Sequence, residues 1–346
     1  MSQGGGGPMS SRLLTSTWAW MVAGIVVLAL VPALVPSPLV RDLIIHSAIL
    51  GLFATSVNLL IGYTGLVSFG QAMFYASGAY GFALLMRSGS VPVLPALAIA
   101  VAASALMALV VGLVCTKTRE IYFALLTLAI QMMFYNTILS WQAVTGGDQG
   151  ITGGFAKPPF LGIDLNKPDH VYYFIAAVVV LSLGLLWHIT KSPFGHALRM
   201  IRDNAARVEF LGLDVPGYRL VAFVISSAVA SIAGAMMALY VSAAYPNFGY
   251  WTMSGEAIFV IMLGGLNTFL GPMVGAVILS LLNHFVTAHT KYYGLVLGII
   301  ILFYALVLRK GLLDIVMERL GDARQRRGAS GRDGPASQDG TAARSA

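Results

Sequence analysis

The densest group of charged side chains before the C-terminal tail lies in the segment 191–216. These side chains could form ion pairs and hydrogen bonds with a soluble partner. Apolar residues recur among them at spacings of three and four, which predicts an amphipathic helix that starts near His196 and ends at Gly212. The polar members are Arg199, Arg202, Asp203, Asn204, Arg207 and Glu209, and the apolar members are Leu198, Ile201, Ala205, Val208 and Leu211.

Two settings would suit this helix. It could lie on lipid headgroups with its basic side chains extended toward water, or it could insert into a groove on a soluble partner. Asp203 and Glu209 favour the second setting, because an anionic lipid surface attracts cations and repels carboxylates. We therefore expect the helix to dock on a partner.

Chemistry catalysed by the chain itself is not expected. No Gly-x-x-x-x-Gly-Lys-Ser/Thr phosphate loop is present, because Lys117-Thr118 and Lys191-Ser192 lack the preceding glycine. Cys115 is the one cysteine, which excludes an intrachain disulfide and a cysteine-based metal site. No basic–aromatic motif of a nucleic-acid binder occurs. We predict no catalytic residue, no metal, no bound cofactor and no nucleic-acid partner.

Two glycine-rich segments and several uncharged polar residues could either line a pathway through the membrane or serve close helix packing. The segments Gly65–Gly81 and Gly264–Gly275 stand in comparable places in the two halves of the chain. Interrupted helices of small residues often mark a transport pathway, although close helix packing uses the same residues. The candidate lining residues are Asn58, Ser68, Gln71, Gly264, Gly265 and Asn267.

The composition defines the elements that must position these residues. Of the 346 residues, 58% are hydrophobic and 10% are charged, whereas a soluble domain carries about 25% charged residues. Apolar runs such as 91–115 do not alternate with polar residues, which excludes a transmembrane β-barrel. We predict an all-α, polytopic transmembrane bundle of about ten helical segments, some of them broken or re-entrant. The expected apolar segments are 18–36, 41–62, 65–86, 91–115, 120–140, 170–190, 217–242, 254–288 and 292–309.

The distribution of positive charge predicts the topology. If the glycine-interrupted segment 254–288 counts twice, the chain crosses ten times, and 16 Lys and Arg residues lie inside against five outside. A single crossing there would put the eight positive charges from Arg309 onward outside. We therefore expect a flexible N-terminus over 1–17, a transmembrane domain over 18–309 and a disordered basic tail over 310–346. Both termini would be cytoplasmic, with an inner loop at 191–216 and an outer loop at 141–169.

Ionisable residues near the middle of a span would indicate a self-contained, ion-coupled transporter. The candidates Asp42, His46, Glu256 and His284 all fall near the ends of predicted segments. An internal ion relay is therefore not favoured, and the stand-alone secondary transporter remains the weaker alternative.

Several segments, in order along the chain, resemble the permeases of ABC importers for branched-chain amino acids, and within that family the LivM type of subunit. The inner loop from Arg199 to Gly212, followed by Tyr218-Arg-Leu-Val-Ala-Phe-Val-Ile-Ser-Ser, carries the resemblance most clearly. Gly62-Tyr-Thr-Gly-Leu-Val-Ser-Phe-Gly-Gln-Ala-Met-Phe, Arg119-Glu-Ile-Tyr-Phe-Ala, Thr145-Gly-Gly-Asp-Gln-Gly-Ile, Val260-Ile-Met-Leu-Gly-Gly-Leu-Asn-Thr-Phe-Leu-Gly-Pro and Arg309-Lys-Gly-Leu-Leu also match. The family more often has His at the position of Gln71 and often Ser at that of Asn267.

The resemblance implies a subunit of a binding-protein-dependent importer in the bacterial cytoplasmic (inner) membrane. It implies a homologous second permease of the LivH type, two ATPase subunits of the LivG and LivF type that hydrolyse ATP, and a periplasmic substrate-binding protein. The loop 196–212 would be the coupling helix, through Arg199, Arg202, Asp203, Asn204, Glu209 and Gly212. Related permeases move urea, short amides or other amino acids, so these cargoes remain the alternative.

Overall fold

The computed structural model describes residues 38–89, 91–118, 120–154 and 165–289, with a few helical positions between 295 and 302. Within these ranges the chain folds into ten α-helices, α2 to α11, and two short 3₁₀ turns. The expected first span at 18–36, the two terminal segments at 1–17 and 310–346, and most of the span at 292–309 lie outside the described residues. The helical bundle predicted from the composition is confirmed.

Six of the described helices are long and apolar enough to cross a membrane. The bounds of all but α11 match the predicted segments within a few residues, because an uninterrupted apolar run of about 20 residues has no polar position at which to stop. The six are α2 (Pro38–Thr64), α4 (Val93–Cys115), α5 (Glu120–Ser140), α7 (Pro168–Lys191), α9 (Val215–Val241) and α11 (Gly271–His289).

The predicted span 65–86 is wrong at its start. Residues 65–70 are non-helical, and α3 (Gln71–Arg87) has only 17 residues. The reason lies at Gly65, whose φ of +75° turns the chain out of α2. At 1.5 Å per residue α3 is about 26 Å long, and its first residue, Gln71, is fully buried in the bundle.

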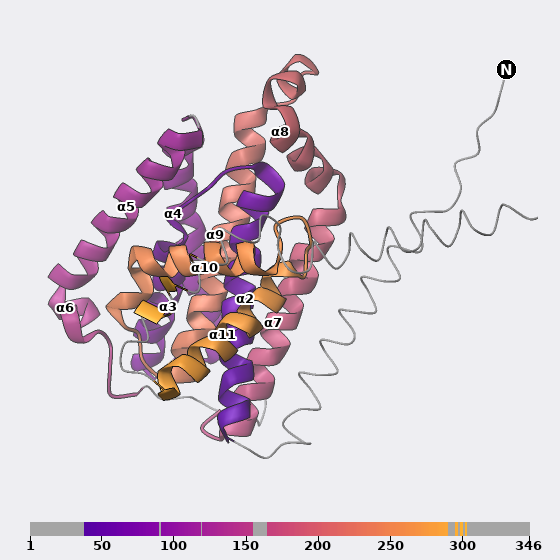
Figure 1. Cartoon of the computed structure of the whole chain (residues 1–346). Coiled ribbons are helices and arrows are strands. Elements are labelled where there is room, and N and C mark those ends of the chain that lie inside the picture. Colours follow the sequence, from indigo (N-terminus) through magenta and orange to yellow (C-terminus); the bar gives the residue numbers. More distant parts are fainter. Residues whose placement is uncertain are drawn as a thin grey trace, which may run out of the picture.

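The segment 254–288 divides into two helices. α10 (Trp251–Gly264) ends at Gly265, whose φ is +130°, and α11 begins at Gly271. The 14 residues of α10 span about 21 Å, short of the ~30 Å hydrocarbon layer. In Figure 1, α10 runs across the long helices rather than along them. We call residues 65–70 and 265–270 the first and second breaks.

α2, α3 and α9 form the centre of the bundle. The most apolar stretch of α2 is 83% buried, whereas those of α4 and α5 are 22% buried. Glycines bring α3 and α9 into backbone contact, because a Cβ on Gly78 would lie 2.1 Å from the carbonyl oxygen of Ser231, and one on Gly234 would lie 1.8 Å from that of Tyr75. The packing role that the sequence left open is therefore observed for these glycines.

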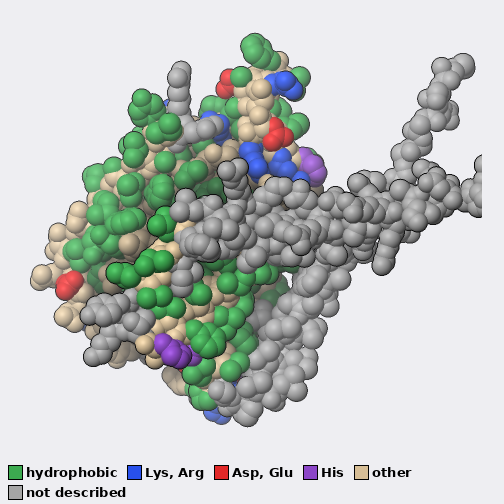
Figure 2. Space-filling model, in the orientation of Figure 1, with side chains coloured by type: hydrophobic (Ala, Val, Ile, Leu, Met, Phe, Trp, Pro, Cys, Tyr) green, Lys and Arg blue, Asp and Glu red, His purple; other side chains and the backbone are tan. Residues whose placement is uncertain are grey.

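Helix α8 (Pro193–Phe210) joins α7 to α9 and projects past the ends of α4 and α5 (Figure 1). Hydrophobic side chains cover most of the visible face of the bundle, while Lys, Arg, Asp and Glu gather over α8 (Figure 2). At the opposite end lie the short α6 (Gln142–Thr145), η1 (Gly147–Gln149) and η2 (Pro246–Gly249).

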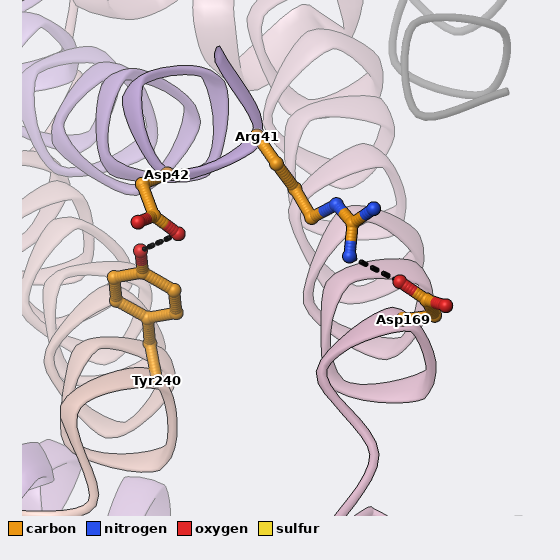
Figure 3. Close-up of polar contacts among 4 residues, drawn as sticks. All are labelled: Arg41, Asp42, Asp169 and Tyr240. Atoms are coloured by element: carbon orange, nitrogen blue, oxygen red, sulfur yellow. Dashed lines mark hydrogen bonds and ion pairs between the residues drawn. The ribbon is translucent and has the colours of Figure 1, made fainter. Parts of the chain in front are cut away.

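Two polar contacts at this opposite end fix the start of α2 to its neighbours (Figure 3). Arg41 forms an ion pair with Asp169 at the start of α7. The hydroxyl of Tyr240, near the end of α9, donates a hydrogen bond to Asp42 at 2.7 Å. The three longest helices are thereby held together at the end remote from α8.

Candidate functional site

The loop helix α8 is bounded by local signals in the sequence. Ser192 caps its start, since the Ser192 hydroxyl accepts a hydrogen bond from the amide of Gly195 at 3.4 Å, and Pro193 occupies the first turn. The helix therefore begins three residues before the predicted His196. Gly212, with φ of +85°, follows its end as predicted, and its amide bonds to the carbonyl of Glu209 at 2.9 Å.

A kink at Asn204, which the apolar spacing did not predict, divides α8. The φ and ψ of Asn204 are −163° and 93°, and its side-chain oxygen accepts the amide of Arg207 at 2.9 Å. Asn204 thus acts as the N-cap of a new turn, which is a favoured position for asparagine. The two parts of α8 are consequently out of phase.

This phase change makes the predicted apolar stripe wrong at one position. Ile201 and Val208 are buried together with Val215, as expected. Leu211, however, is 71% exposed, and the adjacent Phe210, which the pattern did not single out, is 93% exposed. We call Phe210 and Leu211 the apolar tip of α8. Asp203, Arg207 and Glu209 are exposed on the same projecting helix.

Two arginines tie the body side of α8 to the bundle. A terminal guanidinium nitrogen of Arg199 donates to the carbonyl oxygen of Thr190 at 3.0 Å, and the guanidinium lies 5.2 Å from the ring centroid of Tyr63. Arg202 donates to the carbonyl oxygen of Gly62 in α2 and, at 3.2 Å, to the side-chain oxygen of Asn267. These two predicted coupling residues therefore bond to their own chain, and Arg202 is at the same time exposed.

The predicted pathway residues lie around the two breaks. Ser68 is buried in the first break, where its hydroxyl accepts the amide of Gly70 at 3.3 Å. Gln71 is the first residue of α3 and is fully buried, and its side-chain oxygen accepts the Ser226 hydroxyl at 3.5 Å. Neither the amide nitrogen of Gln71 nor either polar atom of the buried Asn58 has a hydrogen-bond partner. Buried, unsatisfied amides are uncommon and indicate a place where water or cargo could supply the missing bonds.

The glycines of the second break serve close packing. A Cβ on Gly264 would lie 1.8 Å from the carbonyl oxygen of Gly271, and one on Gly275 would lie 2.1 Å from that of Val260. These contacts fold α11 back against α10. Asn267 is exposed at the tip of this break. The structure therefore brings Asn267 to α8, while Asn58, Ser68 and Gln71 lie in the interior.

Sequence reasoning missed a second buried polar network. The Ser254 hydroxyl accepts the amide of Ala72 at 2.9 Å and donates to the side-chain oxygen of Gln131 at 3.0 Å. The side-chain nitrogen of Gln131 donates to the carbonyl oxygen of Gly249 at 3.2 Å. This network holds the start of α3 against α5 and α10. The available signal was Gln131, an amide in the middle of an apolar span.

At the end remote from α8, the motif Thr145–Gly150 folds into a compact turn. The Thr145 hydroxyl donates to the carbonyl oxygen of Ile138 at 2.6 Å. Ile151 and Ala244 exchange two backbone hydrogen bonds of 2.9 Å. Asp148 is left exposed on this surface.

Two open hollows lie on the surface of α5. One, of about 580 Å³, is lined by Thr118, Tyr122, Leu125 and Leu126. The other, of about 430 Å³, is lined by Asn136, Thr137, Ser140 and Trp141. Both lie along α5, at one side of the bundle (Figure 1).

These features define a multi-pass helical membrane protein with interrupted central helices and a projecting loop helix. The sequence model of the branched-chain amino acid transport system permease component matches residues 39–305, and the chain belongs to this family.

Curated relatives agree with this assignment. The chain is 26% identical over 295 residues to the high-affinity branched-chain amino acid transport system permease protein LivM of Salmonella typhimurium, covering 79% of this chain and 68% of the relative. It is 25% identical over 283 residues to the probable permease LivH of Methanocaldococcus jannaschii, covering 77% and 88%. It is also 22% identical over 314 residues to the ribose import permease protein RbsC of Escherichia coli, covering 86% and 95%. No solved structure matches the chain.

Proposed function

We propose that the chain is the LivM-type permease subunit of a binding-protein-dependent ABC importer and forms part of the pathway for branched-chain amino acids. The observation that carries the proposal is α8. Its apolar tip and exposed Asp203, Arg207 and Glu209 project from the bundle, while Arg199 and Arg202 join its body side to the transmembrane helices. A helix built in this way can transmit force from a soluble subunit.

The projection of α8 supports docking over a lipid-surface role. A helix that lies on a membrane presents its apolar face along its length to the headgroup boundary. In α8, Leu198, Ile201 and Val208 are instead buried against the chain, and the exposed apolar side chains include those of Phe210 and Leu211 at the projecting end. A soluble ATPase with an apolar groove would cover this tip.

The remaining parts of the proposal follow from the family and the charge distribution. We place the chain in the bacterial inner membrane with the α8 end and both termini in the cytoplasm, because 16 of its 21 Lys and Arg residues then lie inside. A LivH-type permease would complete the pathway, and two LivG- and LivF-type subunits would hydrolyse ATP. A periplasmic binding protein would deliver the cargo. The chain itself would bind no cofactor.

Uptake by reconstituted vesicles tests the function. The chain alone should show no uptake. When it is assembled with a second permease, two ATPases and a binding protein encoded beside it, the vesicles should take up leucine only if ATP is present on the side of the membrane that bears the ATPases. Robust uptake by the chain alone under a proton or sodium gradient would instead establish a secondary transporter.

Cargo identity needs a separate measurement, because the family includes permeases for chemically different solutes. Calorimetric titration of the adjacent binding protein with leucine, isoleucine, valine, urea and acetamide should give tight binding for the first three. Tight binding of urea or acetamide alone would reassign the cargo while leaving the ATP dependence of uptake intact.

A further inference from the structure

The C-terminal end of α2 depends on a cation from another helix. The last four carbonyl groups of a helix have no partner within it, and α2 has no basic residue in its last turn. Gly62 lies in that turn, and its carbonyl oxygen accepts a hydrogen bond from Arg202 of α8. Arg202 therefore satisfies an otherwise open carbonyl group and places positive charge at the negative end of the helix dipole.

The same guanidinium also reaches the second break. Its other terminal nitrogen donates to the side-chain oxygen of Asn267 at 3.2 Å. A guanidinium presents its donors in a fixed planar fork, so it can bond two acceptors on different segments at once. A lysine ammonium lacks this geometry. Arg202 is thus a bridge from α8 to the end of α2 and to the turn between α10 and α11.

The backbones at this bridge approach closely. A Cβ on Gly65 would lie 3.4 Å from the Cγ of Arg202, and a Cβ on Gly62 would lie 2.7 Å from the carbonyl oxygen of Leu266. The same Cβ on Gly62 would lie 2.4 Å from the side-chain oxygen of Asn58. The second break therefore lies against the C-terminal end of α2 beside Asn58, one of the buried amides with no partner.

The position of Arg202 along α8 separates it from the apolar tip, although Arg202 and its neighbour Asp203 are both exposed. Arg202 lies two residues before the kink at Asn204, and the apolar tip lies after it. A partner that covers Phe210 and Leu211 would therefore leave the bridge in place. Movement of the tip would reach the breaks through the capped turn at Asn204, whose side chain fixes the angle between the two parts.

We infer that Arg202 is a positioning residue that locks both helix breaks to α8, so that displacement of α8 moves the two breaks as one unit. This inference rests on the proposed function of α8 as the coupling helix. It assigns Arg202 a role toward its own chain rather than toward the ATPase surface.

Hydrogen exchange of the purified full-length chain in lipid nanodiscs tests the lock without any partner. Arg202→Lys keeps the charge but loses the fork, and it should raise exchange about tenfold at both 62–70 and 265–270, since each bridging hydrogen bond is charge-assisted. Asn267→Ala should raise exchange at 265–270 alone. Thr268→Ala is the matched control, because its hydroxyl has no hydrogen-bond partner, and it should change neither segment. Unchanged exchange at both breaks in Arg202→Lys would overturn the inference.

The assembled transporter then tests the consequence of the lock. Arg202→Lys should retain ATP hydrolysis but consume at least tenfold more ATP per substrate imported, at an unchanged midpoint of thermal unfolding. The double variant Arg202→Lys, Asn267→Ala should consume little more ATP per substrate imported than Arg202→Lys alone, because the two residues share one hydrogen bond. Equal loss of hydrolysis and uptake would mean that Arg202 serves docking instead. If the unmodified assembly shows no ATP-driven uptake, the proposed function fails, but the exchange result still decides whether the bridge exists.

Discussion

The contact between α3 and α9 makes a quantitative prediction for Gly234→Ala. A Cβ at this position would lie 1.8 Å from the carbonyl oxygen of Tyr75, and contacts of real Cβ atoms are at least 3.0 Å. The helices must therefore separate by more than 1 Å. No side chain can rotate to relieve the contact, because both sides are backbone.

The expected change in the free energy of unfolding follows from two opposing effects. Alanine gains about 1 kcal/mol over glycine in a helix interior, whereas overpacking of this kind costs about 1–3 kcal/mol or more. Because the required shift involves two backbones, we expect the upper part of that range and a net loss of about 2 kcal/mol. A loss of this size lowers the unfolding midpoint by about 3 °C in a chain of 346 residues, at about 2.1 cal/mol/K of unfolding entropy per residue.

Gly184→Ala provides the matched control. Gly184 lies within α7, and a Cβ there would have no atom within 4 Å. Thermal unfolding in detergent, followed by tryptophan fluorescence, should show a lower midpoint for Gly234→Ala and an equal or higher one for Gly184→Ala. Equal midpoints for the two variants would refute the argument that α3 and α9 are in backbone contact.

Three further predictions concern the loop helix and the remote end. The double variant Phe210→Ser, Leu211→Ser should no longer copurify with the ATPase subunits, while its unfolding midpoint stays unchanged because both side chains are exposed. If the ATPases still copurify, α8 lies on the lipid surface instead of docking on them. Asn204→Ala should lower the stability of α8 by about 1 kcal/mol through loss of the cap. In electron paramagnetic resonance, the distribution of distances between spin labels on the two parts of α8 should broaden. A distribution as narrow as that of the unmodified chain would show that the cap is dispensable. Gly150→Ala should disrupt the backbone bridge between Ile151 and Ala244, because the φ of Gly150 is +69° and a Cβ there would lie 2.2 Å from the Ala244 carbonyl oxygen. The variant should need a higher concentration of binding protein for half-maximal uptake. An unchanged concentration would show that this turn does not contact the binding protein.

The extent of the long helices could be predicted because it depends on local composition. An apolar run of about 20 residues must form an intramolecularly hydrogen-bonded helix in lipid, and this requirement holds whatever lies beside it. The start of α3 could not be placed in the same way. Gly65 leaves the helical region through one backbone torsion, and its apolar neighbours Leu66 and Val67 give no sign of it.

The sequence predicted only part of the candidate site, for a similar reason. The spacing of Leu198 and Ile201 identified the buried face of α8 correctly, since the first part of the helix is regular. The capping bond of Asn204 then shifted the phase and exposed Leu211. The predicted periodicity therefore failed at Leu211, while Val208, which also follows the kink, is buried as predicted.

The amino-acid sequence by itself determined that this chain is a multi-pass helical membrane protein with one charged loop helix. It did so because hydrophobic burial in lipid and the scarcity of charge act residue by residue. Only the tertiary structure decided that Arg202 joins Gly62 to Asn267, and that Gly78 and Gly234 bring α3 and α9 together. These residues are separated by as many as 205 positions, and directional hydrogen bonds and backbone contacts between them exist only once the helices have packed.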